Sequence, residues 1–559
     1  MEDESSVERE LGALTELPKG EGFTFSYSSA NVDRNALRVM NAVFDPIKVG
    51  AVRSKMHRAR LSFKDLKNDL MEYKSIKASR QHTDAYYMVL QSVVNDLQPA
   101  EKVVPITKRA VVQHQNFPGS KSSGFPYKQR GLTTKRMAVE EPGVMDEINE
   151  LWANIGKQHK IELPDVAVYA RAQVCSREKN KVRATWGYPL AVYLQEGTYF
   201  YPILDHLKSI DQPIIAYGTE MSTGGMEYIN AMVNSSAALP ILMGDWSRFD
   251  KTIPAWLIRD AFRIVESWID FRHIKTADGK TKRIDPRFAL RQWRKCISYF
   301  INTPCRLSNG ERFLKHGGVP SGSCFTNVID SIVNAIVMRY ITYELTGELP
   351  VHDMYFGDDS VVVLRKKVSL EVFAEHSFEQ FSMVLNTDKS FQTYNRNNVH
   401  FLGFFNFNGT PRRAADVLVA STIYPEKTVT TKLETVTRLI GQAYCCYQSD
   451  DVKRFFTAAR MLIDEDGLDK RFVLEHIRRN PHLFKYLTTI GVDLSGIRIP
   501  EVDHEDDLLL LTQPSPTRKR FKPRTHNCHE LYHQFLDECD WYAVDEFSDH
   551  SSDLAVDDA

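Results

Sequence analysis

The stretch "VHDMYFGDDSVVVLRKK", from Val351 to Lys367, places two adjacent acids between two apolar runs. The flanking valine, aromatic and methionine residues favour strands, and the Gly-Asp-Asp tripeptide between them is a turn signal. The pattern therefore predicts a β-hairpin with Asp358 and Asp359 at its tip. Ionised carboxylates that lose water at such a position need basic partners or a divalent metal. Because a lone Gly-Asp-Asp is also typical of an ordinary hairpin turn, a metal site requires another acid elsewhere in the chain.

The composition is that of a soluble globular protein with a large core, since 43% of the 559 residues are hydrophobic and 26% are charged. We find no apolar run long enough to cross a bilayer, and the opening "MEDESSVERELG" is acidic, unlike a signal peptide. These features predict a protein of the cytoplasm or of an intracellular particle, without a membrane partner. Eight cysteines with no Cys-x-x-Cys pair favour reduced, structural thiols over a disulfide scaffold.

The charge is distributed unevenly along the chain. Residues 1–500 carry a net charge of +9, and residues 501–559 carry −10. A basic body suits a polyanionic partner, and an acidic segment is typical of a repulsive or interacting appendage. The Pro-containing, basic stretch "LTQPSPTRKRFKPR" precedes residues without Lys or Arg, so we expect residues 501–559 to form a linker and an acidic tail. The basic stretch itself is a solvated charge run, a nuclear signal or an RNA contact.

A further acid stands at the end of a predicted strand in "LPILMGDWSRFDKTIP". There Asp245 follows a short apolar run, and Pro254 opens a segment whose apolar residues recur at helical spacing. If this strand lies beside the hairpin, Asp245, Asp358 and Asp359 converge into a cluster of oxygen ligands. Such a cluster suits two Mg²⁺ ions that share phosphate oxygens of a substrate. Two ions about 3.5–4 Å apart activate an attacking hydroxyl and stabilise a leaving pyrophosphate, which is nucleotidyl transfer.

The segment "GGVPSGSCFTNVIDSIVNAIVMRY" combines a glycine-rich loop with a predicted helix. Polar residues at helical spacing share one face of that helix, namely Ser323, Asn327, Asp330, Ser331 and Asn334. A polar face beside a flexible loop is suited to hold a ribose and a template backbone. Taken alone, the segment is more typical of an amphipathic helix that faces water.

Four basic residues alternate strictly in "ARAQVCSREKNKVRATWGYP", namely Arg177, Lys179, Lys181 and Arg183. In an extended strand all four side chains point to one face and form a cationic strip able to neutralise a triphosphate. A solvent-facing edge strand protected by lysines is the alternative. Further on, residues 427–486 show a largely helical pattern with few breakers, which predicts a helical subdomain.

With these segments in this order, the chain resembles viral RNA-dependent RNA polymerases, and is most similar to those of segmented double-stranded RNA viruses of the partitivirus type. The resemblance covers roughly Phe117 to Glu426, and its most specific pieces are "DWSRFDKTIPAWLIRDAF", "GGVPSGSCFTNVIDSIVN", "YFGDD" and "LNTDKSF". It implies an α+β right-hand fold with fingers, palm and thumb, in which an antiparallel palm sheet packs on helices. The domains we expect are an N-terminal extension with fingers over 1–240, palm over 241–265 and 301–426, a fingers insertion over 266–300, a helical thumb over 427–500, and the linker and tail over 501–559.

The resemblance also implies roles for individual residues. Asp245 and Asp358 bind two Mg²⁺ ions, replaceable by Mn²⁺, and Asp359 assists them. Lys389, in "LNTDKS", takes the place of the lysine proposed to protonate pyrophosphate. The expected nucleotide-binding residues, among which Lys181 and Arg183 contact the triphosphate, are Arg177, Lys179, Lys181, Arg183, Asp250, Ser321, Gly322, Thr326, Asn327 and Asp330.

Two further segments resemble family motifs: "PGSKSSGFPYKQRG" the template-entry motif, and "VHFLGFFNFNG" the primer-grip hairpin. The expected partners are RNA template and product, ribonucleoside triphosphates and a viral capsid protein, in the host cytoplasm inside the virion. The chain departs from many such polymerases at Asp330, where they carry Asn nine residues after the loop serine. Asn327 and Asn334 lie nearby on the same predicted face, so the residue that meets the ribose stays open.

Two other functions compete with this one. A reverse transcriptase also uses metal-bound acids on a palm, but "SGSCFTNVID" and Asp250, placed where the sugar should lie, favour ribonucleotides. A non-catalytic viral RNA-binding or capsid-associated protein accounts for the basic body and the polar helix. It leaves the three separated acids and the cationic strip unexplained.

Overall fold

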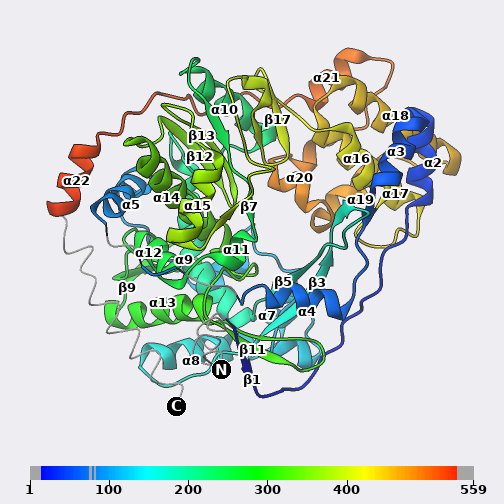
Figure 1. Ribbon diagram of the computed structural model, residues 1–559. Helices are drawn as coiled ribbons and strands as arrows, with labels where there is room; N and C mark the ends of the chain where they lie inside the picture. Colours follow the sequence, from blue (N-terminus) through cyan, green and yellow to red (C-terminus); the bar gives the residue numbers. More distant parts are fainter. Residues whose placement is uncertain (1–13, 75–77, 81–82, 538–559) are drawn as a thin grey trace, which may run out of the picture.

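The protein is seen in a computed structural model that describes residues 14–74, 78–80 and 83–537 (Figure 1). At its centre is a four-stranded antiparallel sheet in the order β12-β13-β6-β15. The strands are β6 (Ile241–Met243), β12 (His352–Phe356), β13 (Asp359–Val363) and β15 (Phe391–Thr393). Successive residues of these strands pack into hydrophobic cores on opposite faces of the sheet, because side chains alternate across a sheet. Leu242 and Val362 pack with helix α14 (Thr326–Thr346), whereas Ile241 and Val363 pack on the opposite face.

Helices cover the first face of this central sheet. Helix α14 packs against β12 and lies among α5 (Asp84–Leu97), α12 (Ala255–Glu266) and α15 (Leu370–Phe381). Helix α10 (Gly225–Asn234) packs against β12 and contributes to the core on the other face. The strand, hairpin and two helices predicted around Asp245, Asp358 and the glycine-rich loop are therefore confirmed.

A second sheet has five strands in the order β1-β11-β10-β3-β5. These are β1 (Leu14–Leu17), β3 (Val166–Ala172), β5 (Val182–Gly187), β10 (Pro304–Arg306) and β11 (Arg312–Lys315). Its core includes α4 (Phe63–Met71), α8 (Val144–Gly156), α9 (Leu190–Ser209) and α13 (Pro286–Ile301). The remaining strands form smaller sheets. The two-stranded sheets are β2 (Met56–Arg58) with β4 (Val174–Ser176), β7 (Trp246–Ser247) with β14 (Val384–Leu385), and β8 (His273–Lys275) with β9 (Thr281–Arg283). A three-stranded sheet consists of β16 (His400–Phe401), β17 (Phe404–Phe407) and β18 (Thr410–Arg412).

A helical lobe follows the sheets in sequence, as its pattern predicts. Its helices are α16 (Ala415–Ile423), α17 (Lys432–Cys446), α18 (Ser449–Asp466), α19 (Lys470–Arg479), α20 (Lys485–Thr489) and α21 (Glu505–Thr512). Two helices from the start of the chain, α2 (Arg34–Val43) and α3 (Pro46–Lys55), also lie here (Figure 1). The Phe44 and Phe455 rings are 5.5 Å apart, and Arg438 pairs with Asp33 at 2.7 Å. Residues 34–55 thus join a lobe that the sequence assigned to residues 427–500 alone.

The segment after α21 differs from the tail that its composition predicts. Residues 513–537, here named the C-terminal strap, cross the molecule and end in helix α22 (Cys528–Asp537), which packs on α5 (Figure 1). Lys519 Nζ donates to the carbonyl oxygens of Lys208 and Ile210 at 2.7 and 2.8 Å. Phe535 stacks on Tyr87 with ring centroids 4.9 Å apart. The prediction of a linker and solvated tail is wrong for the strap where Lys519, Arg524 and Phe535 contact the body of the protein, whereas Arg518, Arg520 and Lys522 are exposed as expected.

Residues 538–559 of the predicted tail lie outside the described residues. Within the described part of the chain, no helix is both long and apolar enough to cross a membrane.

Candidate active site

The register of the central sheet brings the predicted acids together. Leu242 of β6 lies opposite Val362 of β13 in an antiparallel pair. Asp245 comes three residues after Leu242, just beyond the end of β6, and Asp359 comes three residues before Val362. The same register therefore places these two acids at one end of the paired strands. Asp358 stands immediately before Asp359, at the tip of the hairpin. The convergence expected from the sequence thus follows from strand pairing.

The hairpin tip is a two-residue turn. Phe356 and Asp359 are paired, so Gly357 and Asp358 connect the strands, and Gly357 takes a φ of 60° that side chains other than glycine rarely adopt. Two polar residues of α14 fix this turn. Ser331 Oγ accepts the Gly357 N–H at 2.8 Å, and the Asn334 side-chain amide donates to the Gly357 carbonyl at 3.0 Å. Ser331 and Asn334, predicted on a face that holds substrate, instead hold the acidic turn in place.

Lys389 lies in the connection between β14 and β15, which both pair with the chain around Asp245. Asp245 donates its N–H to Ser390 Oγ at 2.8 Å, and its carbonyl accepts the Asn386 N–H at 2.8 Å. These bonds hold the two flanks of Lys389 against the backbone of Asp245. The lysine therefore lines the same cavity as the acid.

A cavity of about 660 Å³ opens above these residues. Of the residues predicted from the sequence, it brings together Lys179, Lys181, Arg183, Asp245, Asp250, Ser321, Thr326, Asp330, Asp358 and Lys389. Acids and bases thus line a single space. A triphosphate with associated divalent cations has the charge pattern that such a mixed lining accommodates.

The predicted extended strand is wrong, because Arg177, Lys179 and Lys181 lie in the turn between β4 and β5, and only Arg183 belongs to β5. Lys179, Lys181 and Arg183 nevertheless line the cavity, whereas Arg177 does not. The chain turns between β4 and β5, where the Lys179 N–H donates to the Ser176 carbonyl at 3.0 Å, and β5 begins only at Val182. Arg177 Nε donates to the Arg53 carbonyl at 2.6 Å, and Arg177 is not part of the cavity lining. A turn interrupts the strict alternation that an extended strand would have continued.

Two other predicted residues support the site from outside the cavity. A Cβ on Gly322 would lie 1.8 Å from the Trp186 carbonyl oxygen, so glycine lets the loop pack directly on β5. Asn327 Oδ1 accepts the Tyr217 hydroxyl at 2.8 Å. Neither Gly322 nor Asn327 lines this cavity, so both residues stabilise it from outside.

Burial and mutual repulsion disfavour the charged form of the acids. Desolvation raises the pKa of Asp358, and Asp245 adds to the effect, whereas Arg183 and Lys181 oppose it. Desolvation and then the neighbouring Asp358 raise the pKa of Asp359 to about 7. A cluster that resists ionisation in this way gains from a bound cation, which restores the carboxylate form.

Asp330 has an unusual position on α14. Burial raises its pKa well above the usual range, and Asp250 and Asp358 add to that shift. Its Oδ1 atom is buried and has no hydrogen-bond partner, yet Asp330 lines the cavity. A buried polar atom without a partner is costly, and a ligand hydroxyl in the cavity would satisfy it.

Sequence reasoning missed Glu196 of α9. Its Oε2 accepts the Ser323 hydroxyl at 2.7 Å and the Cys324 N–H at 2.9 Å. Ser323, predicted on the substrate-holding face, is therefore used to anchor the start of α14. Burial raises the pKa of Glu196 to about 8, against the lowering effect of these two hydrogen bonds. A single charged residue within the otherwise uncharged "LAVYLQEGTYF" was the available signal.

Helix α4 and the residues after it were also missed. Asp65, Asp69, Glu72 and Tyr73 line the cavity from this side. The acids recur at intervals of four and three residues, a spacing that places them on one helix face. That pattern in "SFKDLKNDLMEY" was visible in the sequence, but it belongs to none of the motifs.

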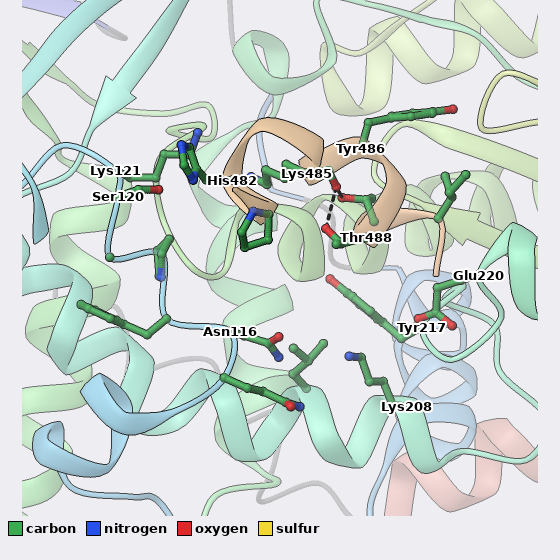
Figure 2. A pocket seen from close by; sticks show the side chains of 18 of the residues that line it. Asn116, Ser120, Lys121, Lys208, Tyr217, Glu220, His482, Lys485, Tyr486 and Thr488 are labelled. Carbon is green, nitrogen blue, oxygen red and sulfur yellow. Dashed lines mark hydrogen bonds between the residues drawn. The ribbon is translucent and has the colours of Figure 1, made fainter. Parts of the chain in front are cut away.

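A second cavity, of about 990 Å³, adjoins the hairpin tip through Phe356 and Tyr217 (Figure 2). Its walls come from residues 115–121, residues 216–221 and residues 479–490. The basic residues in its lining are Lys121, Arg136, Lys208, Arg479 and Lys485, against the single acid Glu220. Figure 2 shows Tyr217 and Lys208 on one side of the space and the segment with His482 and Lys485 on another. This excess of positive charge suits a nucleic-acid backbone.

The donor set at the acidic edge fits Mg²⁺ in part. Among the described residues, no group of three or more His, Cys, Asp or Glu side chains is arranged to hold a metal ion. Asp245 and Asp358 nevertheless line one cavity. Mg²⁺ is commonly bound by one or two carboxylates together with water and substrate phosphates, and two carboxylates meet that requirement.

Comparison with known proteins agrees with this geometry. The family model "Viral RNA-dependent RNA polymerase" matches residues 35–425. The chain is 29% identical over 320 residues to the RNA-directed RNA polymerase of Atkinsonella hypoxylon virus (isolate 2H), a match that covers 50% of this chain and 48% of that protein. It is 29% identical over 350 residues to the RNA-directed RNA polymerase of Cryptosporidium parvum virus 1 (strain KSU-1), covering 58% of this chain and 62% of that one. The chain thus spans about half to three-fifths of the length of these curated relatives.

A solved structure, the Sicinivirus 3Dpol RNA dependent RNA polymerase, superimposes with a TM-score of 0.60 at 14% identity. The match covers 85% of this chain and 99% of that one, and it confirms the right-hand α+β fold. The exact boundaries of fingers, palm and thumb stay a prediction. Since the family model extends over most of the sequence, the chain belongs to the viral RNA-dependent RNA polymerase family.

Proposed function

We propose that the protein is an RNA-directed RNA polymerase, which extends an RNA strand on an RNA template from ribonucleoside triphosphates. One observation carries the proposal: Asp245 and Asp358 line one cavity together with Lys181, Arg183 and Lys389. The acids are suited to the reacting phosphate through metal, and the bases are suited to the rest of the triphosphate.

Asp245 and Asp358 would hold two Mg²⁺ or Mn²⁺ ions, with Asp359 beside them. When bound, the ions supply charge stabilisation at the phosphate oxygens and lower the pKa of the attacking hydroxyl. Arg183 offers paired N–H donors to the triphosphate, and Lys181 adds a second positive charge. Lys389 Nζ is the group we assign to donate a proton to the departing pyrophosphate.

Ribose recognition is assigned to Asp250 and Asp330. Both line the cavity, and the unpartnered Oδ1 of Asp330 accepts a hydroxyl hydrogen without breaking an existing bond. Asn327 already accepts the Tyr217 hydroxyl, and Asn334 is used by the hairpin turn. Among the polar residues of α14, these contacts favour Asp330 as the residue that meets the sugar.

The basic second cavity is assigned to the RNA strands, and residues 115–121 in its wall overlap the segment that resembles the template-entry motif. The resemblance to polymerases of the partitivirus type extends the proposal to replication and transcription of a viral double-stranded RNA genome. It also makes a capsid protein the proposed partner, and the virion in the host cytoplasm the proposed location.

The test is incubation of the purified protein with a defined RNA template, four ribonucleotides and Mg²⁺. Template-dependent RNA product supports the proposal. Product formed only from deoxyribonucleotides would instead indicate a reverse transcriptase. RNA binding without any product would indicate a non-catalytic RNA-binding protein.

A further inference from the structure

Helix α4 and the two residues that follow it form one wall of the nucleotide cavity, although they lie far before the polymerase motifs in sequence. Three parts of the site meet this wall. They are strand β5 with Arg183, the chain that carries Asp250, and the glycine-rich loop before α14. The contacts of Asp69 and Tyr73 show how the wall connects them.

Asp69 ties β5 to the chain around Asp250. Its Oδ2 accepts the N–H of Ala184, the residue after Arg183, at 2.8 Å. Its Oδ1 accepts Lys251 Nζ, next to Asp250, at 2.6 Å. The Lys251 side chain is only 9% exposed, so this charge-assisted bond is weakly screened by solvent. Asp69 therefore joins the proposed triphosphate and sugar sides of the cavity, and Glu72 also accepts Lys251 Nζ, at 2.9 Å.

Tyr73 ties Asp250 to the glycine-rich loop. Its hydroxyl donates to the Val319 carbonyl at 2.8 Å and lies 3.5 Å from Asp250 Oδ2. The Val319 N–H in turn donates to the Asp250 carbonyl at 2.6 Å. A Cβ on Gly318 would lie 2.8 Å from the Tyr73 ring, so the loop packs directly on the tyrosine. The hydroxyl thus occupies the junction between the acid and the loop.

Tyr73 is 1% exposed, so water does not replace the contacts of its hydroxyl. Its ring also contacts Trp186 of β5 edge-on, with centroids 5.3 Å apart. Removing the hydroxyl leaves the Val319 carbonyl without this donor and removes the contact with the Asp250 carboxylate. Both groups are then free to shift by the few tenths of an ångström that weaken a hydrogen bond to a ligand.

Resting on the proposed function, we propose that Tyr73 is a positioning residue for sugar selection: it holds Asp250 and the glycine-rich loop where the carboxylate meets the ribose hydroxyl. A site built to pair with a hydroxyl rejects the analogue that lacks it. Loss of the Tyr73 hydroxyl therefore weakens use of ribonucleotides more than use of deoxyribonucleotides.

The matched control is Tyr86, another buried tyrosine in the same part of the sequence. Its hydroxyl donates to Asp260 Oδ2 at 2.7 Å, and Tyr86 lines neither cavity. Tyr73→Phe and Tyr86→Phe each remove one buried hydroxyl beside an aspartate. A merely structural role of Tyr73 predicts the same result for both variants.

The experiment measures kcat/KM for one ribonucleotide and its deoxyribonucleotide on one RNA template, with thermal melting of each protein. Tyr73→Phe should lower the ratio of ribonucleotide to deoxyribonucleotide kcat/KM about tenfold, the effect of one hydrogen bond of ordinary net strength. Tyr86→Phe should leave the ratio within about twofold at a comparable melting temperature.

An unchanged ratio in Tyr73→Phe, or an equal fall in Tyr86→Phe, would overturn the inference. Wild-type protein that incorporates neither nucleotide would overturn the proposed function itself. The two failures are therefore distinct.

Discussion

Arg339 of α14 should be among the side chains that the fold tolerates losing least. It is fully buried, and its guanidinium reaches Asp353 of β12 at 2.7 Å and Asp96 of α5 at 2.6 Å. It also donates to Ser92 Oγ at 2.9 Å. Three elements, α14, β12 and α5, are thus joined by one cation. The strap adds Arg524, whose guanidinium is 3.2 Å from Asp96.

Replacing Arg339 with Met removes the charge and keeps most of the volume, which leaves two buried carboxylates under-compensated. Removing one partner of a buried ion pair costs about 3–5 kcal/mol. We expect the lower half of that range, since Arg524 remains near Asp96 and also lies 3.9 Å from Asp353. For comparison, Arg38→Met breaks an exposed pair with Glu465 and should cost about 1 kcal/mol or less.

The loss of stability in Arg339→Met should depend on pH in a defined direction. Burial alone would raise the pKa of Asp353, but the charge and hydrogen bonds of Arg339 outweigh it and hold that pKa well below the usual range. The contribution of Asp353 in the wild type is therefore present above its unfolded pKa of about 3.9 and is lost only in stronger acid. In Arg339→Met, the effect of burial on Asp353 is opposed less, so the pKa of Asp353 in the native state rises and this carboxylate binds a proton more readily. The deficit of the variant should shrink as the pH falls from 7.5 to 5.5.

Urea unfolding at the two pH values, followed by tryptophan fluorescence, measures both effects. We expect a lower urea midpoint for Arg339→Met than for the wild type, a smaller difference between the two midpoints at pH 5.5, and almost no change for Arg38→Met. A loss below about 1 kcal/mol at pH 7.5, or a difference that widens in acid, would refute this reasoning.

Three more predictions follow from the strap and the cavity. Truncation after Pro514 should lower the melting temperature, because it removes the contacts of Lys519, Arg524 and Phe535 with the body of the protein; unchanged melting would show that these contacts are dispensable. Arg183→Ala should raise KM for nucleotides in steady-state kinetics, whereas Arg177→Ala should leave it unchanged. Equal effects of the two substitutions would show that Arg177 also binds the nucleotide. Lys389→Leu should slow kcat by about 10²–10⁴-fold with little change in nucleotide affinity, and Lys389→His should retain part of the rate. Weak binding at full kcat would exclude Lys389 as the proton donor.

The parts of the site that the sequence predicted are those with strong local patterns. The hairpin around Asp358 needs only strand formers and a glycine turn, and the strand before Asp245 needs only a short apolar run. Their convergence required one further assumption, that the strands are neighbours, and the β6–β13 pairing supplies it. Family resemblance then placed Lys389, whose position follows from pairing on the other side of β6.

The parts that the sequence did not predict depend on contacts between distant segments. Alternation of bases suggested a single strand through Arg177, but a turn closed by the Ser176 carbonyl ends it. Acidic and basic composition suggested a solvated tail, yet Lys519 finds carbonyl partners some three hundred residues away in sequence. Tyr73 carries no motif, and its role appears only when the loop at Gly318 packs on it. Composition describes average solvation and cannot identify such partners.

The most direct test of the central claim is the rate of RNA synthesis by Asp245→Asn and Asp358→Asn under Mg²⁺, beside the exposed control Asp278→Asn. The first two variants keep the shape of the side chain and remove the charge that the metal ions need, so synthesis should fall by about 10³-fold or more while RNA binding and melting temperature stay near those of the wild type. Asp278→Asn should polymerise normally. Near wild-type synthesis by either Asp245→Asn or Asp358→Asn would contradict the assignment of the cavity as a two-metal polymerase site.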